Sequence, residues 1–109
     1  MSAQEKKFEA IAESIVAGHG ASRGRMFGMP TLSIGGKAFA GYHGDAMVFK
    51  LTGDSHAEAM AIAGAHLFDP SGMGRPMKEW VVIPSGKASQ WERFAARACE
   101  IMQERLGGN

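Results

Sequence analysis

Four histidines and one cysteine are the side chains of this sequence that are best suited to metal binding or nucleophilic chemistry. No two of the histidines are spaced two or four residues apart, the spacing that brings two imidazoles to one side of a strand or helix. The single cysteine, Cys99, excludes an internal disulfide and a zinc site built from cysteines. We therefore expect surface or turn histidines, a buried structural cysteine, and neither a metal nor another cofactor. The histidines are His19, His43, His56 and His66.

Two further segments contain residues that occur at catalytic or phosphate-binding sites. Ser85 lies in Pro84–Lys87, which lacks the glycine–serine–glycine context of a nucleophilic elbow. Gly72–Arg75 combines glycine amides with an arginine, as phosphate-binding loops do. However, Pro76 lacks a backbone N–H, and the segment leads into a predicted strand instead of a helix. The sequence therefore predicts a protein that is not an enzyme.

Composition limits the classes of function. Twelve basic and 11 acidic residues give a formal net charge of +1, which supplies no global field toward nucleic acid or an anionic membrane. The 45% hydrophobic content is that of a globular protein, and 109 residues suit one domain. The sequence shows neither a signal peptide nor an apolar run of roughly 18 residues, the length that suggests a membrane span. We expect a single cytoplasmic domain, residues 1–109, that does not enter a membrane.

Helices and strands that would position any site follow from periodicity and turn residues. Ser2 and Glu5 have capping-box spacing before a helix that we expect to stop at Gly18. Apolar residues with helical spacing predict two more helices, and Gly35–Gly36 predicts a hairpin turn. The glycine- and arginine-rich segment Gly18–Gly28 is interpreted as a connection. The other predicted helices span Asp54–Gly64 and Ser89–Gly107, and the strands are Thr31–Ile34, Lys37–Tyr42, Met47–Leu51, His66–Phe68 and Glu79–Pro84.

The order helix, three strands, helix, two strands, helix predicts an α+β fold of two layers, a five-stranded antiparallel sheet with helices on one face. Trp80, Val82 and Phe94 should link the late strand to the last helix. Thr31–Ile34 is the expected edge strand, and it contains no charge. Because exposed edges favour pairing between chains, we expect a homodimer formed through the sheet.

Several motifs, taken together, resemble known families. They are Arg25–Gly28, Gly35–Ala40, Val48–Leu51 and Pro76–Pro84. Their order and spacing resemble the N-terminal domain of the TfoX/Sxy family, regulators of bacterial competence. A second resemblance is to the YjbR/MmcQ family, often described as DNA-binding. Both resemblances imply a secretion-chaperone-like arrangement of the same elements, in a bacterial protein that forms dimers.

Two hypotheses for function remain open. The first is a non-enzymatic regulatory or binding module of TfoX N-terminal type that contacts an unidentified protein, because flexible methionines near strands can line binding grooves or else close the ends of the core. The second is nucleic-acid binding of YjbR/MmcQ type through a local basic patch, unless the cations are scattered over the surface. The candidate partner-binding residues are Arg23, Arg25, Met29, Met73, Arg75, Met77 and Lys78.

Overall fold

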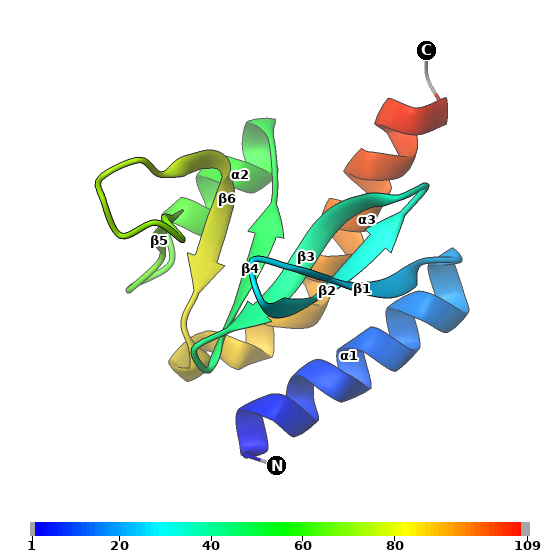
Figure 1. Cartoon of the computed structure of the whole chain (residues 1–109), viewed down its shortest axis with the longest axis horizontal. Helices are drawn as coiled ribbons and strands as arrows, with labels where there is room; N and C mark the ends of the chain where they lie inside the picture. The colour runs from blue at the N-terminus through cyan, green and yellow to red at the C-terminus, as the bar shows by residue number, and fades with distance from the viewer. Residues whose placement is uncertain (1, 108–109) are drawn as a thin grey trace.

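The computed structural model describes residues 2–107, and Figure 1 shows a twisted sheet with helices packed against it. Within this range one antiparallel sheet has six strands in the order β1-β2-β3-β4-β6-β5. The α+β class is therefore confirmed, with one strand more than predicted. The elements are α1 (Ala3–His19), β1 (Ser22–Met26), β2 (Met29–Ile34), β3 (Lys37–His43), β4 (Ala46–Lys50), α2 (Gly53–Met60), β5 (His66–Phe68), β6 (Met77–Ile83), η1 (Ser85–Gln90) and α3 (Trp91–Gly107).

Helix α1 begins with the capping box that the sequence predicts. The Ser2 hydroxyl accepts a hydrogen bond from the Glu5 amide at 3.1 Å, and the Glu5 carboxylate accepts one from the Ser2 amide at 3.2 Å. The helix continues past Gly18 and ends at His19, because the left-handed residue that closes it is Gly20, with φ of 72°. The predicted end was therefore early by one residue.

Strand β1 is the element that the sequence did not predict. It lies inside the segment interpreted as a connection, and it pairs with β2 from Ser22 opposite Ser33 to Met26 opposite Met29. Four of its five residues are exposed, so it shows none of the apolar alternation that identifies a half-buried strand. Its hydrogen-bonded ladder with β2 determines its conformation. Consequently the prediction that Thr31–Ile34 forms the sheet edge was wrong, since β2 lies between β1 and β3.

The first four strands form a meander closed by three two-residue turns. Both residues of each turn have positive φ, as the type I′ hairpin turn requires. Glycine supplies four of these six positions, and Phe27 and Asp45 supply the other two. The turns are Phe27–Gly28, Gly35–Gly36 and Gly44–Asp45.

Alternation along β4 divides the buried side chains between the two faces of the sheet. Met47 and Phe49 belong to a large cluster that includes side chains of all three α-helices, and we call this side the helix face. Ala46 and Val48 point to the opposite side, which we call the open face, and belong to a smaller cluster. No helix contributes a buried residue to that smaller cluster among residues 2–107.

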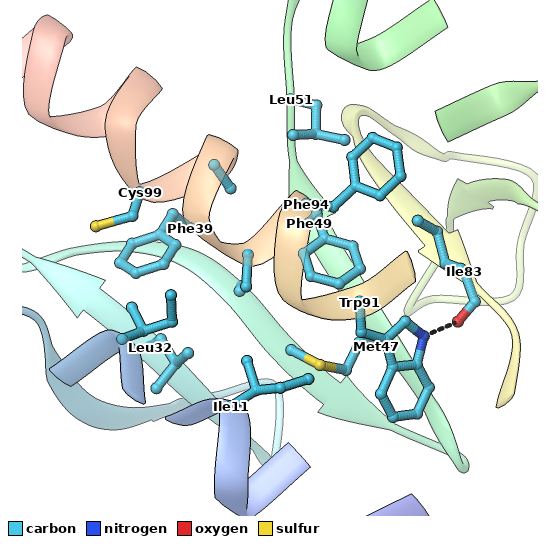
Figure 2. Close-up of a cluster of buried hydrophobic side chains, with 14 of the residues drawn as sticks. Ile11, Leu32, Phe39, Met47, Phe49, Leu51, Ile83, Trp91, Phe94 and Cys99 are labelled. Carbon is cyan, nitrogen blue, oxygen red and sulfur yellow. Dashed lines mark hydrogen bonds between the residues drawn. The ribbon is translucent and has the colours of Figure 1, made fainter. Parts of the chain in front are cut away.

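The helix face contains the main core, which Figure 2 shows in close-up. Trp91, at the start of α3, is fully buried, and its indole N–H donates a hydrogen bond to the Ile83 carbonyl at 3.0 Å. Phe94 packs its ring 6.1 Å from that of Phe49, centroid to centroid. These contacts join α3 to the central strands β4 and β6.

The open face carries the second cluster, and it corrects one expectation. Trp80 and Val82 are buried as predicted, but they belong to the open-face cluster and do not link β6 to α3. The residues of β6 that share the main core with Phe94 are Val81 and Ile83. The buried members of the open-face cluster are Met29, Ala46, Val48, Phe68, Trp80 and Val82.

Within residues 2–107, no helix combines the length and the apolar character that crossing a membrane requires.

Candidate functional site

Two of the basic residues singled out by the sequence lie on β1, at one edge of the sheet. The Arg23 guanidinium lies 2.7 Å from the Glu9 carboxylate of α1 and 5.8 Å from the centre of the Phe8 ring. This hydrogen bond lowers the pKa of Glu9, which favours its charged form. Arg25 donates instead to the Gly28 carbonyl at 2.8 Å. The charge of Arg23 is therefore balanced within the chain.

The other two predicted cations, Arg75 and Lys78, lie just before and within β6 and are exposed. Because β1 and β6 are separated by three strands in the sheet, the two pairs of cations come from strands that are not neighbours. Among the predicted methionines, Met29 is buried and Met77 packs against the same open-face cluster, whereas Met73 is 76% exposed. Met29 and Met77 therefore support the expectation that methionines close the end of a core.

The loop before β6 is organised by one carboxylate. Asp69 accepts hydrogen bonds from the Ser71 hydroxyl at 2.7 Å and from the amides of Gly72, Gly74 and Arg75 at 3.1, 2.9 and 3.1 Å. The Ser71 bond and then the amide bonds hold the pKa of Asp69 below its usual value. The glycine amides that resemble a phosphate cradle in the sequence thus bind a carboxylate of the chain itself.

Phe27 is the most unusual residue of the open face. It occupies the β1–β2 turn with φ of 52°, a left-handed conformation that is rare for a bulky residue and costs on the order of 1–2 kcal/mol. Its side chain is 58% exposed, and its ring centre lies 6.4 Å from that of Phe68 on β5. A strained and exposed aromatic residue is an observation that points toward function.

Two adjoining hollows lie beside this ring. The first, of about 280 Å³, is lined by Phe27, His43, Phe68, Pro70 and Ser71. The second, of about 500 Å³, shares His43 and Phe68 with the first and extends between the β3–β4 turn and β5. The His43 and Phe68 rings meet edge to face with centres 5.3 Å apart. We refer to the two hollows together as the aromatic groove.

The second hollow of the aromatic groove is acidic. Its lining includes Asp45, Asp69 and two histidines, His43 and His66, and among residues 2–107 it includes no lysine or arginine. Asp45 is held in place by a hydrogen bond from the Tyr42 hydroxyl at 3.0 Å. The Tyr42 ring packs on the helix face, so this bond holds the Asp45 carboxylate toward that side of the sheet, and Asp69 is the carboxylate left beside the hollow. A positively charged group would complement Asp69.

A larger hollow, of about 620 Å³, lies between the start of α2 and the exposed side of α3. Four of its five charged residues are already paired, because Arg93 contacts Glu58 and Arg97 contacts Glu100, each at 3.2 Å. It presents no exposed aromatic side chain. The aromatic groove is therefore the better candidate for recognition.

The aromatic groove can be compared with the other reactive groups of the described residues. Across residues 2–107, no group of three or more histidine, cysteine or acidic residues is placed to hold a metal ion. Cys99 is fully buried, and this burial raises the pKa of its thiol, which disfavours the nucleophilic thiolate. What the groove offers is aromatic surface beside the Asp69 carboxylate, a combination suited to an apolar side chain and a cation.

None of Phe27, His43 and Phe68, the three aromatic rings of the groove, was among the candidate partner-binding residues predicted from the sequence. One signal was present, because Phe27 precedes a glycine between two short segments that can pair as strands. Phe27–Gly28 can be recognised as a hairpin turn only if Ser22–Met26 is predicted to be a strand, and the sequence did not predict β1.

Comparisons with known proteins add no match: no family model, no curated protein and no solved structure matches this chain. The resemblance to the TfoX/Sxy and YjbR/MmcQ families stays a prediction.

Proposed function

We propose that this chain is a non-enzymatic binding or regulatory module of TfoX N-terminal type, which acts through protein contacts at the aromatic groove. The observation that carries the proposal is Phe27, which is both exposed and held in a left-handed turn. Strained residues concentrate at ligand clamps and other functional sites. An aromatic ring at the rim of a concave surface is also a typical anchor for a protein partner.

The partner's chemistry follows from the lining of the groove. An apolar or aromatic side chain of the partner would pack against the contacting rings of Phe27 and Phe68, whose centres are 6.4 Å apart. A neighbouring lysine or arginine would extend toward Asp69 in the acidic hollow. The expected ligand is a protein segment in which an apolar residue is followed or preceded by a basic one.

Nucleic-acid binding is the second candidate. One observation favours it, since Arg25 lies two residues from Phe27 and has no carboxylate within 4.0 Å among residues 2–107. A cation beside an exposed aromatic ring can bind phosphate while a base stacks on the ring. Against it, the charges of Arg23 and Arg105 are balanced by Glu9 and Glu79.

The test begins by selecting binders from a library of random 12-residue peptides displayed on phage. We expect enriched peptides to contain an aromatic or aliphatic residue beside lysine or arginine. Their affinity, measured by fluorescence anisotropy, should fall at least tenfold in Phe27→Asn, because the ring that anchors the ligand is lost. Met60→Ala, which removes an exposed apolar side chain of α2 outside the groove, should bind within twofold of the unmodified protein.

Two results would overturn the protein-binding proposal. One is a selection that enriches no peptide, and the other is equal affinity for Phe27→Asn and the unmodified protein. The same anisotropy measurement with a labelled single-stranded oligonucleotide tests the second candidate. Affinity that decreases steeply with salt and is lost in Arg25→Glu would favour nucleic acid instead.

A further inference from the structure

Strand β1 is an exposed edge of the sheet, and its geometry shows which backbone groups are free. Met26 and Met29 flank a two-residue turn, so they exchange both of their backbone hydrogen bonds. Bonded and non-bonded pairs alternate along an antiparallel ladder, which makes Gly24 the next bonded residue of β1. The N–H and C=O groups of Arg23 and Arg25 therefore point away from β2.

Pro30 supports this assignment. It lies opposite Arg25, where the non-bonded register requires no N–H from β2, and proline has none to offer. In the described part of the chain, no backbone hydrogen bond outside the sheet engages Arg23 or Arg25. Two donors and two acceptors are thus free to extend the ladder.

The charges near this edge are complementary to a second copy of the same edge. Arg23 is bonded to Glu9, which raises the pKa of Arg23, and the nearby charge of Glu13 adds to this effect. Two carboxylates of α1 therefore lie near one cation. Within residues 2–107, the Arg25 side chain in contrast donates only to the Gly28 carbonyl. One additional positive charge beside Glu9 and Glu13 would balance the group.

We propose that two copies of this chain associate by antiparallel pairing of β1 with β1 of the second copy, around a two-fold axis near Gly24. This register places Arg23 of one copy opposite Arg25 of the other. The Arg25 guanidinium of the second copy then approaches Glu9 and Glu13, and the reciprocal contact forms at the other end. The pairing is self-complementary, as a two-fold interface must be.

This arrangement replaces the edge that the sequence suggested. The strand Thr31–Ile34 is internal and has no free ladder, whereas β1 has one. Two arginines directly opposite each other would repel, so the dimer depends on both carboxylates of α1. An acidic strand of another protein is the competing occupant, and it predicts a monomer in the purified protein.

The experiment measures the mass of the full chain by sedimentation equilibrium up to about 100 µM, a range that captures weak association. We expect a mass that rises toward twice 11.6 kDa with concentration. Arg25→Pro removes an outward N–H while leaving the bonds from β1 to β2 intact, and it should shift the dissociation constant at least tenfold upward. Circular dichroism before and after heating checks that the variant is folded.

A charge exchange provides the matched control. Arg25→Glu should abolish the dimer, and adding Glu13→Arg to that variant should restore it, because the opposite charges are exchanged across the interface. A single-chain mass at every concentration would overturn the proposal, as would a dimer that Arg25→Pro and Arg25→Glu leave unchanged. Phe27→Asn should dimerise like the unmodified protein, so failure of this proposal is distinguishable from failure of the aromatic groove.

Discussion

The two faces of the sheet bury apolar side chains by different means. On the helix face, side chains from three helices close the core, and Trp91 and Phe94 are buried almost completely. On the open face, a cluster of six buried residues is bordered by a turn and a loop, with Phe27 exposed at its rim. One side of the sheet is thus filled by the chain itself, and the other leaves aromatic surface accessible.

The difference separates stability from recognition within one sheet. In a core closed by helices, each methylene that is removed lowers the free energy of unfolding, because neighbouring groups cannot collapse into the space. A cluster at the surface can rearrange or admit water when a side chain is lost. Recognition on the open face can therefore change with little effect on the fold.

The largest expected effect compares two phenylalanines. Phe94→Ala on the helix face should lower the free energy of unfolding by about 3–5 kcal/mol, the usual cost of a large cavity in a closed core. Phe68→Ala on the open face should cost about 2 kcal/mol, because the adjoining groove lets solvent fill the space. Urea denaturation of both variants measures the difference. Equal losses would mean that the two faces do not differ in this respect.

A smaller effect of opposite sign is expected at the turn. Phe27→Asn places a residue that tolerates the left-handed conformation before Gly28, as in the most common type I′ turns. After loss of the contact with Phe68, the free energy of unfolding should still rise by about 0.5 kcal/mol. Thermal and urea unfolding provide the measurement. A loss of 1 kcal/mol or more would show that Phe27 stabilises the open face and is not held there at a cost.

The smallest effect is confined to the loop bonded to Asp69. The pKa of Asp69 is lowered in the folded chain. The ionised carboxylate therefore contributes its full stabilisation of the folded loop above the ordinary carboxyl pKa of about 3.9, and this stabilisation is lost as the pH falls through the lowered pKa. NMR signals of the Gly74 and Arg75 amides should therefore stay constant from neutral pH to about pH 4 and shift only below it. Asp69→Asn, which cannot ionise, should remove this transition. A midpoint above the ordinary carboxyl value would contradict the network.

Most of the helix face could be predicted from the sequence because its determinants are local and periodic. The apolar stripe of α1 includes Phe8, Ile11 and Ile15, all buried as helical spacing indicates. The faces of β6 were harder to assign. In Glu79–Pro84 both faces of the strand carry large apolar residues, and such a run does not indicate which residues face the helices.

The open face could not be predicted to the same extent because it depends on pairings between distant segments. Strand β1 forms through its ladder with β2, and its exposed residues leave no hydrophobic pattern. Phe27 and Phe68 come together only when the β1–β2 turn contacts β5, which is the last strand in the order of the sheet. The methionines Met29 and Met77 were noticed by composition, but their place in the open-face cluster follows from this same closure.

The three two-residue turns also determine the order in which the sheet can assemble. Each joins strands that are neighbours in the chain, so β1 to β4 can pair by closing short loops within microseconds. The pairing of β4 with β6 must instead close a loop that contains α2 and β5, which carries a greater entropic cost. We therefore expect the meander of β1 to β4 to form before β5 and β6 pair with it and complete the open face.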